Sequence, residues 1–385
     1  MAMCALMATA TLTSCEGALD DIFGEWSRPV QKKECPISFS ISSKLWGSKD
    51  SKFTVEVTKN GDYTVTFSSS DPSIATVDPN TGEVTPVGAG TVDIIAKIVV
   101  DNEGIFESTT AKYTLTIEEG NQYMKWNETT KQMEIAFIDA TAMSSTTGDL
   151  TLTAGTYIVS EDITITGDVK LSGDVNIILC DGKTLKMNNC LYCYTVWNDF
   201  HGLNIYGQSE NTGKLTVSYG IQNAKPLNVY GGQIDITTTI SQYVFRQIDG
   251  MNVYGGKVNA ECNYSSGGIG IQMKTGMLTI YGGEVSAKGG IVSTTENSVG
   301  ISGNVEVNGG KLVAISRGSS STGGQGIYGD LTVNGGSVEV NYSNGKAVSG
   351  SITAGAGVLE ESDDETSWTT ITGTSSTKHY IRTKP

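Results

Sequence analysis

From residue 150 onward, the chain alternates apolar and polar positions in short stretches that are separated by glycines. One short motif occurs six times. It consists of two apolar residues spaced two apart, then tyrosine or asparagine, then glycine. Its first glycine falls at positions 207, 231, 255, 282, 309 and 335, so the repeat length is 24 to 27 residues. Period-two alternation puts every second side chain on one face of a strand, so each repeat predicts half-buried strands that bend at glycine.

Repeats of this length indicate a solenoid, because one repeat cannot bury its apolar face alone and must stack on its neighbours. A second apolar position precedes most glycine bends, for example at Ile221, Ile301 and Ile327, which favours three short strands per repeat. A helical repeat would need apolar residues at period 3.6 and fewer than the 47 glycines present. We predict an all-β fold in which residues 150–359 form a single-stranded, right-handed parallel β-helix, with a C-terminal cap over 360–385.

Residues 36–118 carry the pattern of a separate β-sandwich. Alternating apolar stretches lie at 53–57, 65–67, 92–98 and 113–117, and turn sequences such as Asn60-Gly61 and Asp71-Pro72 separate them. A small sandwich needs only short strands of this kind. The next segment, 119–149, we predict to be a junction and N-terminal cap, because its apolar residues would cover the first coil: Trp126, Met133, Ile135, Phe137 and Ile138.

Three motifs in the sandwich region resemble the bacterial immunoglobulin-like group 2 domain. They are Ser70-Asp-Pro-Ser-Ile-Ala-Thr-Val77, Gly82-Glu-Val84 and Val87-Gly-Ala-Gly-Thr-Val92, in the order that the family has them. The resemblance covers most of 53–98 and implies an Ig-like fold at 36–118. It also implies a stalk or adhesive module of a surface protein, without catalytic residues.

The first residues resemble the signal of a bacterial lipoprotein. Residues 1–15 are short and fairly apolar, and Leu12-Thr-Ser14 leads into Cys15, as in a lipobox. The resemblance implies that Cys15 is lipidated, and the missing basic segment implies a true start upstream. Acidic residues after Cys15 are similar to the surface-export signal of Bacteroidetes lipoproteins. We therefore expect 16–35 to be a tether, and the protein to be lipid-anchored in the outer membrane and exposed at the cell surface. The alternative is a disordered N-terminus with an incidental cysteine.

The net charge and the cysteine spacing limit which ligands and cross-links the chain can have. The formal net charge of −15 argues against nucleic-acid binding, which needs a basic surface. Cys190-Leu-Tyr-Cys193 has the spacing of a metal knuckle, but no second pair or nearby histidine completes a site. We predict buried thiols and no metal, and leave open a Cys190–Cys193 disulfide or one that contains Cys180. Without Cys4 and Cys15, an odd number of cysteines remains: Cys35, Cys180, Cys190, Cys193 and Cys262.

Catalysis is not supported by the outward positions of the repeats. Glycoside hydrolysis needs two carboxylates about 5 to 9.5 Å apart, which acids at equivalent positions of neighbouring coils would supply, since strands stack about 4.8 Å apart. No two neighbouring coils place acids in one column, and we expect His201 in an exposed loop. The outward residues after the bends are Gln233 and Asp235, Lys257 and Asn259, Glu284 and Ser286, Lys311, Ser337 and Glu339.

Binding is better motivated, because tyrosine precedes the glycine bend in four successive repeats. Alternation points these residues outward, where stacked rings form an amphipathic strip suited to sugar rings. The alternative is a self-stacking ladder that stabilises the coils by about 0.5 to 1 kcal/mol per pair; both roles stay open. The candidate ligand-binding residues are Tyr206, Tyr230, Tyr254 and Tyr281.

The glycine bends and downstream Gly-Ile elements between 220 and 350 also resemble a family of calcium-associated, carbohydrate-binding β-helix proteins. That family carries an Asp-Gly-Ile element, but here only Asp249-Gly250 keeps the acid, so we predict no cofactor and leave calcium open. We predict a non-catalytic cell-surface carbohydrate-binding or adhesion lipoprotein, a monomer that holds a polysaccharide or host glycan along the outer face of the β-helix. The alternative is a structural or adhesive stalk with a protein partner; a third hypothesis is a polysaccharide lyase or hydrolase.

Overall fold

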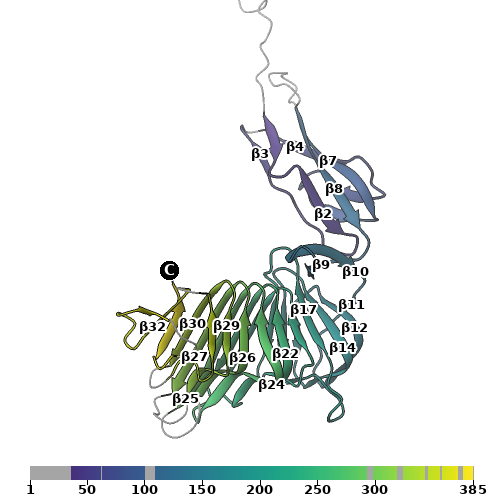
Figure 1. Cartoon of the computed structure of the whole chain (residues 1–385). Coiled ribbons are helices and arrows are strands. Elements are labelled where there is room, and N and C mark those ends of the chain that lie inside the picture. Colours follow the sequence, from purple (N-terminus) through teal and green to yellow (C-terminus); the bar gives the residue numbers. More distant parts are fainter. Residues whose placement is uncertain are drawn as a thin grey trace, which may run out of the picture. The chain divides into compact units, whose positions relative to one another are not determined.

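The computed structural model describes residues 36–61, 63–99, 109–292, 298–318, 324–342, 346–355, 358–371 and 376–384. The chain divides into two compact units, Met1–Glu118 and Glu119–Pro385, and the described residues contain strands and no helix (Figure 1). In this part of the chain no helix is therefore long and apolar enough to cross a membrane. The predicted signal at 1–15, Cys15 and the tether at 16–35 lie outside the described residues.

The N-terminal unit is a small β-sandwich. Its main sheet has the order β2-β8-β7-β4, and the pairs β1–β3 and β5–β6 complete the fold. The predicted alternation over 92–98 is confirmed, since every second residue of β7 from Val92 to Ile98 is buried. The strands are β1 (Ile37–Phe39), β2 (Ser43–Gly47), β3 (Val57–Lys59), β4 (Val65–Ser69), β5 (Ala75–Val77), β6 (Val84–Pro86), β7 (Gly90–Ile98) and β8 (Thr110–Glu118).

One stretch of the sandwich differs from the expected pattern. The strand expected over 53–57 is reduced to β3, which begins at Val57. Phe53 instead forms an isolated bridge with Val84 of β6, and its ring packs 4.7 Å from the ring of Trp46. Phe53 and Trp46 are both half-buried at this contact and pack against the core of the sandwich.

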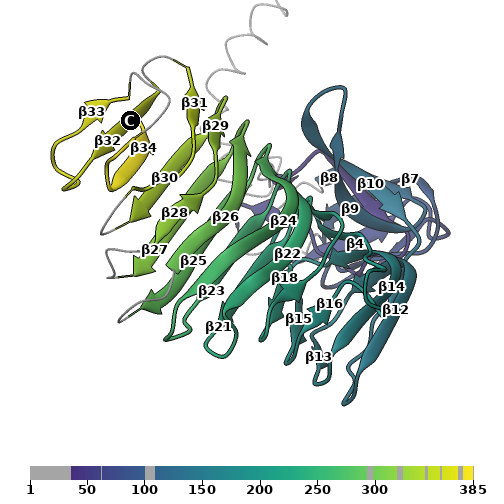
Figure 2. The same cartoon turned by 60° about the horizontal axis from the view of Figure 1, so that its bottom comes forward.

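The C-terminal unit is a parallel β-helix whose successive coils stack strand upon strand (Figure 2). Within the described residues, one long sheet runs β13-β15-β18-β21-β23-β25-β27-β30-β34-β32-β33. Its strands are β13 (Ile163–Ile165), β15 (Thr184–Met187), β18 (Lys214–Val217), β21 (Gln233–Thr238), β23 (Lys257–Cys262), β25 (Glu284–Val292), β27 (Lys311–Gly318), β30 (Ser337–Tyr342), β32 (Leu359–Ser362), β33 (Thr369–Thr370) and β34 (Tyr380–Thr383).

The other long sheet contains the remaining two strands of each coil. Several of its strands continue through a bend and pair with two strands of the next coil. For example, β14 pairs with β16 at Val169 and with β17 from Val175 to Leu179. Its strands are β11 (Thr141–Ala142), β12 (Leu150–Val159), β14 (Val169–Leu179), β16 (Leu191–Tyr192), β17 (Leu203–Gly207), β19 (Ile221–Gln222), β20 (Leu227–Val229), β22 (Tyr243–Val253), β24 (Gly268–Ile280), β26 (Ser298–Val307), β28 (Gln325–Tyr328), β29 (Leu331–Val333) and β31 (Ile352–Ala354).

The interior of the β-helix consists of apolar columns held in strict register. One column begins Leu203, Leu227, Met251, and each of these side chains is fully buried. Burying such a side chain is worth about 1.5–3 kcal/mol, so a column of this kind supplies much of the cohesion between coils. Polar ladders line the outside in the same register; Asn228 Nδ2 donates to Asn204 Oδ1 at 2.8 Å, and Asn252 Nδ2 donates to Asn228 Oδ1 at 2.9 Å.

A second glycine follows the first in five of the six bends, and Gly256 shows two separate reasons for it. Gly256 has a φ of 73°, a left-handed conformation that glycine adopts without strain. A Cβ placed there would also lie only 2.4 Å from the carbonyl oxygen of Gly232 in the preceding coil. The bend is therefore a point of backbone-to-backbone contact, which explains the second glycine in five of the six repeats; Gln208 takes its place in the first.

Both ends of the β-helix are covered by strands. At the C-terminal end, β34 pairs antiparallel with β30, and β32 and β33 extend the sheet beyond it. At the other end, β11 pairs with β12. The hairpin of β9 (Asn121–Asn127) and β10 (Gln132–Ile138), which we expected over the first coil, instead lies along the flank of several coils. It does so because its aromatic residues pack on the tyrosine column.

Candidate functional site

The four predicted tyrosines form a continuous stack on the flank of the β-helix. Ring centroids are 4.6 Å apart for Tyr206 and Tyr230, 4.8 Å for Tyr230 and Tyr254, and 4.9 Å for Tyr254 and Tyr281. The rings are parallel to within 4°. The spacing equals the distance between strands of a sheet, about 4.7–4.9 Å, so the backbone register imposes the stack.

The hairpin β9–β10 covers much of this stack, which we call the tyrosine ladder. Tyr123 meets the ring of Tyr206 edge-on at 5.0 Å. Trp126 packs 5.3 Å from Tyr254 and 5.8 Å from Tyr281. All four ladder tyrosines are half-buried, and this burial raises the pKa of Tyr254 to about 12. The ladder is therefore an aromatic cluster inside the unit more than an open strip on its surface.

A different surface gathers outward side chains in the open, namely the outer face of β21, β23, β25, β27 and β30. Its register places acids apart, as predicted: Asp235 lies opposite Asn259, and Glu284 lies between Lys257 and Lys311. The alternating charges pair, with Lys257 Nζ 3.3 Å and Lys311 Nζ 3.6 Å from Glu284 carboxylate oxygens. The outer face is thus polar but locally neutral.

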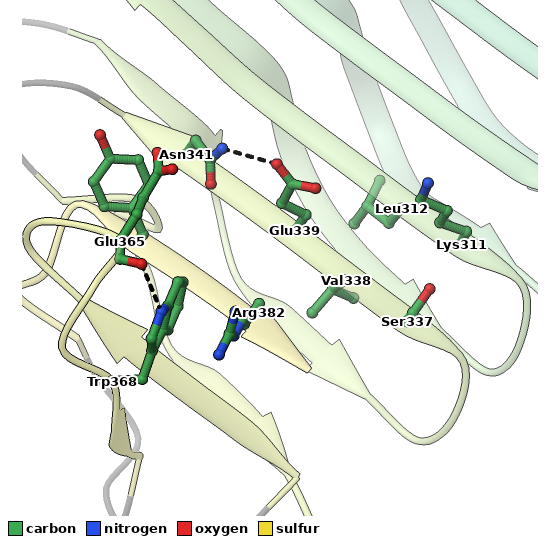
Figure 3. A pocket seen from close by; sticks show the side chains of 10 residues that line it. Lys311, Leu312, Ser337, Val338, Glu339, Asn341, Glu365, Trp368 and Arg382 are labelled. Carbon is green, nitrogen blue, oxygen red and sulfur yellow. Dashed lines mark hydrogen bonds between the residues drawn. The ribbon is translucent and has the colours of Figure 1, made fainter. Parts of the chain in front are cut away.

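At its C-terminal end this face carries a hollow of about 280 Å³, here called the cap pocket (Figure 3). Its floor is formed by residues of β27 and β30, and its wall by the loop before β33 and by β34. Two aromatic residues and a set of polar groups therefore converge on one space, as in many small-molecule sites. The lining residues are Lys311, Leu312, Ser337, Val338, Glu339, Asn341, Glu365, Trp368, Tyr380 and Arg382.

The wall of the cap pocket is held in place by its own contacts. The guanidinium of Arg382 lies 3.8 Å from the Trp368 ring centroid and 3.2 Å from a Glu360 carboxylate oxygen. The indole N–H of Trp368 donates to the carbonyl of Glu365 at 3.0 Å. Asp364 accepts backbone N–H groups of residues 366 and 367, and these hydrogen bonds hold the pKa of its carboxyl well below the usual range. Trp368 is thereby fixed before any ligand arrives.

A second hollow of about 420 Å³, the groove of β21–β25, lies on the same face. It is more polar than the cap pocket and contains no aromatic residue. Asn259 Nδ2 donates to Asp235 Oδ1 at 2.9 Å, and Lys214 Nζ lies 2.8 Å from Asp235 Oδ2. Both contacts lower the pKa of Asp235, so this acid is ionised at neutral pH. The lining residues are Gln233, Ile234, Asp235, Lys257, Asn259, Glu284, Ser286 and Lys288.

The loop between β16 and β17 presents another set of aromatic residues, which we call the aromatic loop. Trp197 is 62% exposed, and its ring meets those of Tyr194 and Phe200 edge-on at 5.8 Å. Lys274 of β24 holds its ammonium group 4.4 Å from the Phe200 ring centroid. Sequence reasoning missed this loop, because three aromatic residues within seven positions carry no strand or turn signal.

His201 lies in this loop, but its side chain is not exposed to solvent, so the prediction of an exposed histidine is wrong. Its side chain is only 14% exposed, and its Nε2 is buried without a hydrogen-bond partner within the described residues. Asp199 Oδ2 lies 3.6 Å away. The His201 backbone N–H donates to the Cys193 carbonyl at 2.8 Å, which joins the two ends of the loop.

Three cysteines of the β-helix are buried. Cys190, Cys193 and Cys262 are buried free thiols, so the Cys190–Cys193 disulfide that we had left open is not formed. Burial raises the pKa of Cys190 to about 12. The part of the chain that the structure describes contains no group of three or more His, Cys, Asp and Glu residues arranged to hold a metal ion.

Comparison with known proteins identifies the N-terminal unit. No curated protein sequence matches the chain. Residues 42–109 match the family model of the bacterial Ig-like domain, group 2. The matched residues contain the three motifs noted above. The β-sandwich is therefore a bacterial Ig-like domain of group 2, and a parallel β-helix follows it along the chain.

Proposed function

We propose that this protein is a non-catalytic, cell-surface carbohydrate-binding or adhesion lipoprotein that holds a glycan on the outer face of its β-helix. The observation that carries the proposal is the cap pocket. It joins the indole of Trp368 and the phenol of Tyr380 to carboxylate, amide, hydroxyl and guanidinium groups within one open hollow. An aromatic ring that flanks hydrogen-bonding groups suits a sugar, which has an apolar face and a rim of hydroxyls.

The site moves in this proposal from the tyrosine ladder to the cap pocket. The sequence hypothesis assigned glycan contact to Tyr206, Tyr230, Tyr254 and Tyr281, but the rings of these residues are half-buried and packed against the hairpin. A sugar cannot lie flat on Tyr254, because the rings of Tyr230 and Tyr281 already stack on its two faces at 4.8 and 4.9 Å. Trp368 is half-buried too, with the Arg382 guanidinium 3.8 Å from its ring centroid, but it lines an open hollow. We therefore assign the first contact to Trp368 and a stabilising role to the ladder.

A glycan array probed with the full chain tests the proposal. We expect binding to at least one polysaccharide, and we expect Trp368→Ala to lose it while far-UV circular dichroism stays unchanged. Trp197→Ala, which removes an exposed indole from the aromatic loop, is the matched control and should bind like the parent chain. A folded chain that retains no glycan would refute the proposal. Loss of binding by Trp197→Ala alone would move the site to the aromatic loop.

The lipoprotein part of the proposal rests on the sequence around Cys15 and on the family of the N-terminal domain. A lipid on Cys15 would anchor the chain, and the Ig-like domain would act as a spacer between membrane and β-helix. Labelling of cells with an alkyne-bearing palmitate should mark the parent chain and leave Cys15→Ser unmarked. Digestion of intact cells with proteinase K should remove the chain if it is surface-exposed.

A second candidate function, adhesion to a protein partner, is favoured by the aromatic loop. Trp197 and Val196 are 62% and 66% exposed, and the Lys274 ammonium lies 4.4 Å from the Phe200 ring of the same loop. Tryptophan, tyrosine and arginine are the residues that dominate protein interfaces. Under this alternative, Trp197→Ala would abolish cell adhesion and Trp368→Ala would leave it intact.

A further inference from the structure

We infer that the ligand is an extended, uncharged polysaccharide chain that lies across the strands from the cap pocket into the groove of β21–β25. The inference rests on the proposed function and names the ligand class of the same face. It follows from three features of that face: the continuity of its two hollows, their combined length, and their balance of charge.

The two hollows adjoin. Glu284 of β25 lines the groove, and Lys311 of β27 lines the cap pocket. These two residues are register partners on neighbouring strands, and their charged groups lie 3.6 Å apart. Figure 2 shows β21, β23, β25, β27 and β30 side by side, with β34 beyond them. A ligand that fills the cap pocket therefore meets the groove at its next strand.

The combined length exceeds what one sugar ring needs. Six strands, from β21 to β34, contribute to the two hollows. Five spacings of roughly 4.8 Å between them give a track of about 24 Å. Hydrogen-bonding side chains recur along this track, since Asn259, Ser286 and Ser337 each come from a different strand. A linear chain that runs parallel to the axis of the β-helix would meet a new polar residue at every coil.

The charge balance selects an uncharged chain. The hollows are lined by four acidic and four basic side chains, so their formal charges sum to zero although the whole protein carries −15. Most of these charges already have partners in the protein: Lys288 pairs with Glu261 at 3.6 Å, and Asp235 pairs with Lys214 at 2.8 Å. A charged ligand would have to break such pairs, whereas hydroxyl groups can share them. The residues are Asp235, Glu284, Glu339 and Glu365, with Lys257, Lys288, Lys311 and Arg382.

The test is a length series measured with the full chain by isothermal titration calorimetry. The probes are cello-, xylo-, manno- and malto-oligosaccharides from disaccharide to hexasaccharide, with oligogalacturonates of the same lengths as charged counterparts. We expect at least one uncharged series to bind more tightly as it lengthens, with affinity unchanged by added salt. Asn259→Ala should lower the affinity for the hexasaccharide about fivefold, the effect of one lost hydrogen bond. It should leave the affinity for the disaccharide unchanged.

Asn228→Ala is the matched control, because it removes an amide that makes a similar contact between coils, 2.8 Å to Asn204, on another face. It should bind every probe like the parent chain. If the hexasaccharide binds no better than the disaccharide, the extended track is wrong and the cap pocket alone remains. If oligogalacturonates bind more tightly than the uncharged series, the ligand class is wrong. If no oligosaccharide binds the folded chain, but the array shows a polysaccharide that does, the inference fails while the proposed function survives.

Discussion

Removal of one ring from the tyrosine ladder is the sharpest test of how this β-helix is held together. Tyr254 sits at the centre of the aromatic cluster, with ring contacts to Tyr230 at 4.8 Å, Tyr281 at 4.9 Å and Trp126 at 5.3 Å. Each aromatic pair is worth about 0.5–1.5 kcal/mol beyond the area it buries. Three such contacts give about 3 kcal/mol, so we expect Tyr254→Ala to destabilise the unit by at least that amount, because the area that the ring buries is lost as well.

Two further variants separate the ring from other causes. Tyr254→Phe keeps all three ring contacts and should lie within about 0.5 kcal/mol of the parent chain. Tyr328→Ala removes a tyrosine that is 58% exposed and outside the ladder, and should be equally mild. A double-mutant cycle of Tyr254→Ala with Trp126→Ala isolates the contact to the hairpin.

The assay is calorimetry of the full chain, in which the two units are expected to unfold in separate transitions. The transition of the β-helix should move to lower temperature in Tyr254→Ala and stay in place in both controls. If Tyr254→Ala behaves like Tyr328→Ala, the stacked rings contribute nothing beyond the backbone register that aligns them. The reasoning that makes the hairpin a stabilising cover would then be wrong.

Three other outcomes follow from the described contacts. Burial raises the pKa of Tyr254 to about 12, above the value of about 10 for an unfolded chain. The stability that the neutral phenol contributes is therefore complete below pH 10 and is lost as the pH rises through 12. A pH series of unfolding midpoints should show this loss, and Tyr254→Phe should remove part of the pH dependence. Gly256→Ala should lower the free energy of unfolding by about 3 kcal/mol or more. Gly182→Ala should lower it by only about 1 kcal/mol, because Gly182 has a similar φ of 71° but no atom within 4 Å of an added Cβ. Equal unfolding midpoints of the two variants in denaturant would refute the close approach at Gly256. Cys190, whose pKa is raised to about 12, should react with a thiol reagent only after unfolding, and reaction in the native chain would contradict its burial.

The repeat pattern was sufficient to predict the β-helix, because its cause is local. Period-two alternation and glycine bends fix which residues point inward, and the column of Leu203, Leu227 and Met251 forms wherever coils stack. The bacterial Ig-like motifs were equally direct, since they lie within one short domain. The outward columns could also be read from the spacing alone, as the opposition of Asp235 and Asn259 shows.

The candidate site was harder to predict, because its parts come from distant segments that do not repeat. Trp368 lies in the cap and faces β30 only because β34 pairs antiparallel with β30. The repeat pattern does not predict this reversal of chain direction. The cover over the tyrosine ladder has the same origin. Trp126 belongs to a hairpin whose docking place, about Tyr254, depends on packing of aromatic surfaces and not on any motif.

The position of the β9–β10 hairpin has a consequence for how the chain is made. Trp126 contacts Tyr281, a residue 281 − 126 = 155 positions later in the sequence. During synthesis or export from the N-terminal end, the hairpin emerges long before the coils on which it docks. Its aromatic residues must therefore wait, exposed, until the strand that carries Tyr281 has joined the stack. Completion of the aromatic cluster thus marks the moment when more than half of the solenoid is in place, and a chain arrested earlier would offer this hairpin to chaperones and proteases.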